Sequence, residues 1–333
     1  MDVSAHLAHL TGVPTARLRH FGHRHAWNLY QAELSDGRDV FVKVADTNPD
    51  SVTGTRAGSD VETSLDSVSA ATDGSESEGI ASGDAASDAM SGGSKPGAIT
   101  TGVLEAEAAG LHWLADSGID IVPPVLAADS TMLVLPWLST ESATADAAEK
   151  LGRDLAALHA TGVSSYGASW PGFIATLPLD NTITTGEWGS WYADYRLAPY
   201  LRTAAPILGR DGTRLIERVM DRIDHLAGPP EPPSRIHGDL WSGNILWSAD
   251  RAMLIDPAAH GGHRETDLAM LALFGAPHLD RIRAAYDEAT PLGSGWRQRI
   301  PLHQLHPLLV HVVLFGDSYR GMALSAAAAA LSG

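Results

Sequence analysis

Residues 47–100 divide this chain into two unequal parts, and no other stretch limits its fold as much. They hold 11 Ser, 8 Gly and nine acidic residues, and no aromatic residue lies between Phe41 and Trp113. Such a composition buries too little apolar surface to offset the entropy of ordering the chain, so we predict a disordered insertion. A linker between two independent domains is the alternative. About 46 residues precede the insertion, too few to form a stable domain alone, so we expect them to share a core with the chain that follows.

The overall composition excludes several kinds of partner. The 333 residues suffice for two lobes, and 23 basic against 40 acidic residues give a net charge of −17. A polyanion is a poor match for nucleic acid or an anionic membrane. No cysteine is present, which excludes disulfides and thiolate chemistry. The first residues lack the basic and apolar regions of a signal peptide, so we expect a cytoplasmic protein without membrane contact.

Residues 1–136 predict a small antiparallel sheet with one helix. The strands NLYQAEL and DVFVKVA flank the turn SDGR, and two further strands are expected within residues 122–138. Between them, residues 100–118 show the apolar spacing of a helix, through Leu104, Ala108, Leu111 and Leu114, and Gly118 supplies a stop signal. We interpret these residues as one lobe, interrupted by the insertion at 47–100.

Residues 137–333 predict a larger, mainly helical lobe. Residues 145–160 form an amphipathic pattern with Leu151, Leu155 and Leu158 on one face. Residues 164–187 are rich in loop signals, and short strands are expected around 235–256. The predicted fold class is therefore α+β, with two lobes of unequal size.

Three polar residues lie beside short apolar runs in the second lobe. Asp239 and Asn244 occur in RIHGDLWSGNIL, and Asp256 follows in MLIDPAAH. Phosphoryl transfer needs a base near the attacking hydroxyl and oxygen ligands for Mg²⁺, and the Asp-to-Asn spacing of five is that of a kinase catalytic loop. We predict that Asp239 is the base and that Asn244 and Asp256 bind Mg²⁺. Turn formation alone is the alternative explanation.

Lysine usage points to the same chemistry. The chain holds only three lysines against 20 arginines, yet one of them, Lys43, lies within the apolar strand DVFVKVA. A compact ammonium suits phosphate oxygens in a way that the planar guanidinium does not. A carboxylate must then position it, and we favour Glu107 over Glu105. The alternative is an edge-strand lysine that points into solvent.

These motifs resemble those of the fructosamine kinase (ketosamine-3-kinase) family. The resemblance rests on HGDLWSGNILW, LIDPAAHGGHRETDLAMLALFG and LGRDLAALHATG, and it covers the chain except for residues 47–100. Tryptophan after Asp-Leu and Pro-Ala after the later Asp are typical of this family rather than of choline kinases. The family has a protein-kinase-like fold, shared with aminoglycoside phosphotransferases.

The resemblance implies ATP-dependent phosphorylation of the 3-hydroxyl of a ketosamine, such as a ribulosamine or fructosamine. The unstable product releases the amine, so the activity repairs glycated small molecules or proteins. Asp267 matches a position that braces the catalytic loop, although a helix N-terminal charge is the alternative. Trp241 and Glu265 are expected on the sugar side, or else are structural. The amine substituent is expected to project into solvent.

Two stretches depart from the family pattern. The turn FGHRHAWN is expected to contact nucleotide through Gly22, His23 and Asn28, but it has one glycine where several are usual. Pro136 stands where relatives carry glutamate, and proline lacks an N–H group. The preference for ATP over other triphosphates is therefore an open question.

Other functions are considered beside the ketosamine kinase. One is a kinase for another hydroxylated amine, such as an aminoglycoside or amino sugar, and another is a pseudokinase binding module. The presence of Lys43, Asp239, Asn244 and Asp256 argues against the pseudokinase. Fifteen histidines form sequence clusters without zinc-site spacing, so we expect no transition-metal site. We expect a monomer.

Overall fold

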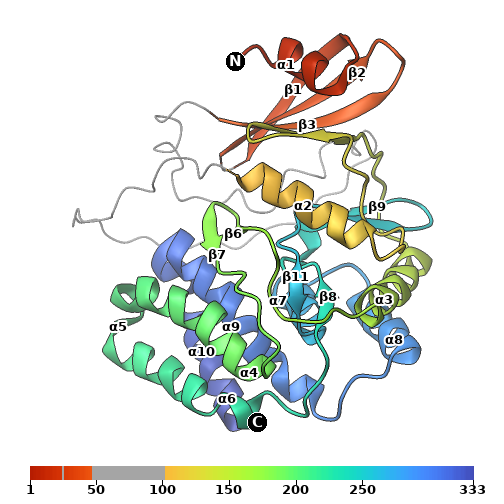
Figure 1. Cartoon of the computed structure of the whole chain (residues 1–333). Helices are drawn as coiled ribbons and strands as arrows, with labels where there is room; N and C mark the ends of the chain where they lie inside the picture. Colours follow the sequence, from red (N-terminus) through yellow and green to blue (C-terminus); the bar gives the residue numbers. More distant parts are fainter. Residues whose placement is uncertain (25, 47–101) are drawn as a thin grey trace, which may run out of the picture.

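The computed structural model describes residues 1–24, 26–46 and 102–333, which form an antiparallel sheet packed on a larger helical part (Figure 1). The predicted insertion lies outside the described residues, and so does His25. The sheet has the strand order β1-β2-β3-β5-β4, and every neighbouring pair is antiparallel. Its strands are β1 (Thr15–Arg24), β2 (Trp27–Leu34), β3 (Asp39–Ala45), β4 (Ala127–Ala128) and β5 (Met132–Pro136).

The two faces of β3 bury different partners. Side chains alternate along a strand, so Val40, Val42 and Val44 point to one face and pack in a cluster with Leu7 of α1 (Val3–Thr11). Lys43 lies on the opposite face, which covers α2 (Val103–Ala115). The alternation therefore directs Lys43 toward the junction of the sheet and the helical part.

Helix α1 is a second helix in the small lobe, which the sequence analysis did not predict. The Asp2 side chain caps it by accepting hydrogen bonds from the backbone N–H groups of Ser4 and Ala5, at 3.0 and 3.2 Å. Leu7 is fully buried against the sheet. Val3 and Leu10 of the same helix pack against the cluster around Leu7, and such tertiary packing supplies most of the stability of a helix of nine residues.

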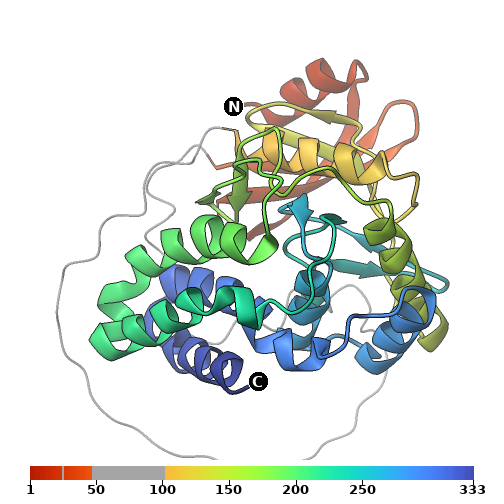
Figure 2. The same cartoon turned by 60° about the horizontal axis from the view of Figure 1, so that its bottom comes forward.

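Helices dominate the rest of the chain, and α5, α9 and α10 pack together (Figure 2). The longer helices are α3 (Ala145–Ala160), α5 (Ala198–Asp221), α7 (Glu265–Phe274), α8 (Leu279–Ala289), α9 (Trp296–Phe315) and α10 (Arg320–Ser332). Short helical segments are α4 (Trp188–Tyr192), η3 (Ala193–Leu197), α6 (Ile223–Leu226), η4 (Ser242–Asn244) and η5 (Gly316–Tyr319). No helix in the described ranges is long and apolar enough to cross a membrane.

Three two-stranded sheets lie among these helices. They pair β6 (Gly172–Ile174) with β7 (Leu177–Leu179), β8 (Ser234–Ile236) with β11 (His260–Gly262), and β9 (Ile245–Trp247) with β10 (Ala252–Leu254). The β9–β10 hairpin is the one expected from NILW and MLID. It brings the residue before β9 and the residue after β10 to the same end.

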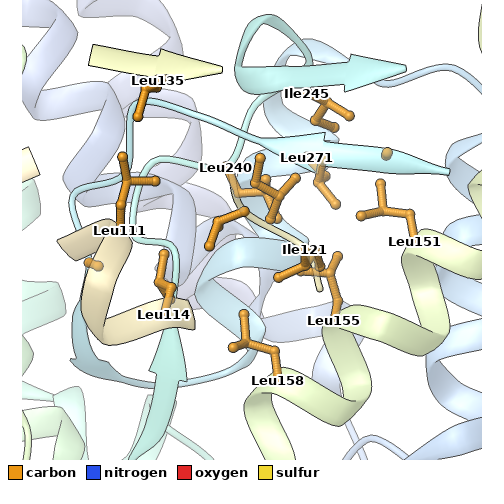
Figure 3. Close-up of a cluster of buried hydrophobic side chains, with 14 of the residues drawn as sticks. Leu111, Leu114, Ile121, Leu135, Leu151, Leu155, Leu158, Leu240, Ile245 and Leu271 are labelled. Carbon is orange, nitrogen blue, oxygen red and sulfur yellow. The ribbon is translucent and has the colours of Figure 1, made fainter. Parts of the chain in front are cut away.

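One apolar core joins the sheet to the helical part (Figure 3). Leu135 of β5 and Leu111 of α2 share this core with Leu151 of α3. Leu240 and Ile245, which directly follow Asp239 and Asn244, are buried in the same cluster. The two polar residues are therefore held by apolar neighbours that are anchored in the core.

A buried carboxylate fixes the turn that follows β8. Asp267, in the first turn of α7, accepts hydrogen bonds from the backbone N–H groups of His237 and Gly238, at 2.8 and 2.9 Å. Its Oδ2 also lies 3.2 Å from His159 Nε2. Gly238 has φ 82°, and a Cβ there would lie 2.3 Å from the carbonyl oxygen of Ala258, so only glycine fits this turn.

We predict that Gly152→Ala destabilises the fold, although alanine normally stabilises helices by about 0.5–1 kcal/mol relative to glycine. A Cβ at this position of α3 would lie 2.2 Å from the carbonyl oxygen of Ile282 in α8. The expected loss is about 1–3 kcal/mol of unfolding free energy, measured by urea denaturation. Gly321→Ala in α10, where nothing lies within 4 Å, is the control and should cause no loss. Equal effects of the two changes would contradict the close packing of α3 on α8.

We also predict that Asp267→Asn lowers the unfolding free energy by about 1–3 kcal/mol, because an amide cannot accept both backbone hydrogen bonds through paired oxygens. Asp280→Asn is the matched control, since Asp280 lies in the first turn of α8 but is exposed. Its effect should stay within about 0.5 kcal/mol. Chemical denaturation of both variants decides the matter, and a result for Asp267→Asn like that of its control would remove the proposed brace.

Candidate active site

Five polar residues from separate elements meet where the sheet joins the helical part. Lys43 comes from β3 and Glu107 from α2. Asp239 lies in the turn after β8, Asn244 ends η4, and Asp256 follows β10. Short hydrogen bonds connect them in two groups, which share the neighbourhood of Asp256.

The first group is a charge chain centred on Lys43. Its ammonium donates to Glu107 Oε2 at 2.7 Å and to Asp256 Oδ1 at 3.1 Å. Lys43 and Glu107 are both buried, whereas Glu105 is exposed, so the structure pairs the lysine with the favoured glutamate. Burial raises the pKa of Glu107. Burial acts in the same direction on Asp256, but Lys43 and Arg24 outweigh it and lower the pKa of Asp256 to about 2.

The second group joins Asp239 to Asn244. Asn244 Nδ2 donates to the backbone carbonyl of Asp239 at 2.8 Å and to its Oδ2 at 3.2 Å. Burial, with the nearby charge of Asp256, raises the pKa of Asp239 to about 7. A carboxylate with such a pKa can accept and release a proton near neutral pH, which is the requirement for a general base.

The side-chain oxygens at this site suit a hard divalent cation. Because the Asn244 amide nitrogen makes the hydrogen bond to Asp239, the amide oxygen Oδ1 can serve as a metal ligand. Asp256 adds an anionic carboxylate and has a strained backbone, with φ 53°. Mg²⁺ binds in proteins through one or two such oxygens, with water and phosphate completing its shell. The residues present therefore fit Mg²⁺.

Arg24, which belongs to the turn expected to contact nucleotide, also contacts this charge cluster. Its Nη1 lies 3.8 Å from Asp256 Oδ2, and its guanidinium lies 5.5 Å from the centroid of the Trp241 ring. Arg24 ends β1 in the turn FGHRHAWN, so its place in that turn was the available signal. It brings a positive charge from the small lobe over the larger one.

The other residues of the turn have different surroundings. His23 Nε2 lies 3.3 Å from Asp46 Oδ2, and Asn28 Oδ1 lies 3.2 Å from His20 Nε2. Gly22 has open space where a Cβ would lie. Nucleotide contacts by Gly22, His23 and Asn28 therefore remain predictions.

Trp241 and Glu265, both expected on the sugar side, differ in their positions. Trp241 is partly exposed, two residues after Asp239. Glu265 is buried and accepts two hydrogen bonds from Arg299, at 2.9 and 2.5 Å, so it has an internal partner, and its contact with the sugar stays a prediction. This ion pair joins residues 34 positions apart, so local sequence cannot reveal it.

The same ion pair bears on a second cluster of ligating side chains. His263, Glu265 and His303 offer atoms that lie within 4.8 Å of one another, and all three residues are buried. Arg299 occupies both carboxylate oxygens of Glu265, and its positive charge opposes a cation there. Glu265 is therefore neutralised by Arg299, and the rings of His263 and His303 pack on Trp188.

An aromatic group flanks the end of β5. The Phe21 ring lies 6.1 Å from Phe41 and 5.6 Å from Trp137, and Phe21 is 41% exposed. Trp137 follows Pro136, and its backbone N–H donates to the carbonyl of Asp39 at 3.0 Å. The sequence analysis did not single out these rings, because their meeting depends on how β1, β3 and β5 pair.

Comparisons with known proteins identify the family and the fold. The sequence profile described as fructosamine kinase matches residues 97–332. A putative fructosamine-3-kinase structure from Thermobifida fusca is 45% identical, with a TM-score of 0.82, over 100% of this chain and 99% of that one. A probable ketoamine kinase from Thermus thermophilus is 36% identical over 222 residues, which span 66% of this chain and 79% of that protein.

A more distant structure shows the same fold. An aminoglycoside phosphotransferase in complex with ADP and hygromycin B has a TM-score of 0.57 at 12% identity, over 100% of both chains. The fold is therefore that of the protein-kinase-like phosphotransferases. The profile match covers most of the chain, and it includes Asp239, Asn244 and Asp256. The chain belongs to the fructosamine kinase family.

Proposed function

We propose that this protein uses ATP and Mg²⁺ to phosphorylate the 3-hydroxyl of ketosamines, and so releases amines from sugar adducts. The observation that carries the proposal is the convergence of Lys43, Glu107, Asp239, Asn244 and Asp256. Family membership supplies the acceptor class, because the matched relatives carry the names fructosamine-3-kinase and ketoamine kinase.

In this mechanism each residue has a separate task. Asp239 accepts the proton of the attacking hydroxyl, and Asn244 holds the Asp239 carboxylate in place. Lys43, positioned by Glu107, binds phosphate oxygens, and Asn244 Oδ1 and Asp256 are the ligands for Mg²⁺. When bound, Mg²⁺ neutralises charge on the transferred phosphoryl group.

The aromatic group at the end of β5 is a suitable place for the base of a nucleotide. Phe21, Phe41 and Trp137 offer apolar rings beside the segment that follows β5. Pro136 lacks an N–H group, so only its carbonyl is available for the base. The distant relative whose structure contains ADP has the same fold, which supports ATP as the donor.

Trp241 supports an acceptor that combines a sugar with a cationic amine. Its ring already lies beside the Arg24 guanidinium, so it can accept a cation over its face. An aminoglycoside shares hydroxyl groups and positive charge with a ketosamine, and the same fold serves a protein bound to hygromycin B. This likeness makes an aminoglycoside kinase the second function to be tested.

We predict that the purified protein, with ATP and Mg²⁺, phosphorylates a ribulosamine or fructosamine with higher kcat/KM than an aminoglycoside. We expect ribulosamines to be better acceptors than fructosamines, because a shorter sugar needs less room in the pocket. Efficiencies measured side by side, with the phosphate located by NMR, test the proposal. A preference for the aminoglycoside, or equal activity on the free sugars, would overturn it.

Asp239→Asn is the matched control for this assay. It removes the proton acceptor while keeping the size of the side chain, so turnover should fall by about two orders of magnitude or more with ATP binding nearly intact. Near-normal turnover in that variant would instead exclude Asp239 as the base.

A further inference from the structure

A row of aromatic rings leads away from the turn that holds Asp239, and we call this row the aromatic wall. The Trp241 ring lies 6.2 Å from Phe274, and Phe274 lies 5.1 Å from His311. His311 in turn lies 5.4 Å from Phe315 and 4.7 Å from Tyr319. The wall therefore begins two residues after Asp239 and continues over the end of α7, α9 and η5.

The outer part of the wall is unusually exposed for aromatic side chains. Phe274 is 37% exposed and Phe315 is 45% exposed. Phe21, beside the proposed nucleotide site, is the other exposed phenylalanine in the described residues. Single apolar residues scattered over a protein surface are common and need no function. A contiguous exposed apolar surface, in contrast, usually marks a binding site.

The chemistry of the wall changes along its length. At its inner end, the Arg24 guanidinium lies beside Trp241, which shows that this ring can take a cation. Farther out, His311 Nδ1 donates to the carbonyl of Pro307 at 2.7 Å, and burial lowers the pKa of the ring, which disfavours its charged form. The wall therefore offers a cation-binding ring first and an apolar surface beyond it.

A ketosamine has the same order of groups. Its sugar hydroxyl must reach Asp239, its secondary ammonium follows, and the amine substituent comes last. We propose that the outer aromatic wall, formed by Phe274, His311, Phe315 and Tyr319, binds the amine substituent and favours adducts whose amine carries an aromatic or extended apolar group. This inference rests on the proposed function, and it replaces the expectation that the substituent projects into solvent.

The test compares two adducts of one sugar. The ribulose adduct of benzylamine carries an aromatic substituent, whereas the adduct of 2-aminoethanol carries a small polar one; the two fructose adducts are assayed in parallel. We expect the wild-type kcat/KM for the benzylamine adduct to exceed that for the aminoethanol adduct by about tenfold, as one added aromatic contact allows.

Variants connect this preference to the wall. Phe315→Ala should reduce the ratio of the two efficiencies severalfold, and Phe315→Leu should reduce it less, because leucine keeps part of the apolar surface. Leu126→Ala is the control, since Leu126 is also exposed but lies next to β4 in the small lobe. It should leave the ratio unchanged.

Each result separates the two proposals. Equal efficiencies for both adducts in the wild type, or an unchanged ratio in Phe315→Ala, would overturn the inference while the ketosamine kinase stands. Failure to phosphorylate any of these adducts would instead overturn the proposed function. If sedimentation shows that Phe315→Ala dissociates an assembly and the ratio persists, the wall joins copies of the chain and the inference is wrong.

Discussion

The ammonium of Lys43, shared between Glu107 and Asp256, is the interaction on which the site depends. It joins the sheet, α2 and the segment after β10, which are far apart in the sequence. A buried charge without a partner is costly, so each of the three groups holds the others in place. The alternation of β3 determines this arrangement, because the valines on one face pack beside α1 and the lysine must then point to the other.

The turn that holds Asp239 and Asn244 has its own support. Leu240 and Ile245 anchor it in the core that both lobes share (Figure 3). Asp267 of α7 accepts hydrogen bonds from its backbone. Sites are held most accurately when rigid elements and buried hydrogen bonds fix them. Asp239 and Asn244 can therefore keep their mutual geometry before any substrate arrives.

The sequence predicted the parts of this site that depend on short-range patterns. The spacing of Asp239 and Asn244 and the hairpin that follows are local, and the structure contains both. Contacts between residues far apart in the sequence were harder to predict. The Arg299 partner of Glu265 and the meeting of Arg24 with Asp256 depend on how distant elements pack, so no local pattern reveals them. Helix α1 was missed because its apolar signal is short, although Asp2 gave a capping signal.

The most direct test concerns the role of Asp256, which contacts Lys43 and is proposed to bind Mg²⁺. Calorimetry would measure ATP affinity with Mg²⁺ and with a chelator, for the wild type and for Asp256→Asn. We expect Mg²⁺ to tighten ATP binding to the wild type by about tenfold or more, because Asp256 would supply an anionic ligand for the metal that accompanies the nucleotide. The variant should lose this difference, since an amide in place of the carboxylate removes the anionic ligand. An equal effect of Mg²⁺ on both proteins would contradict the proposed metal site.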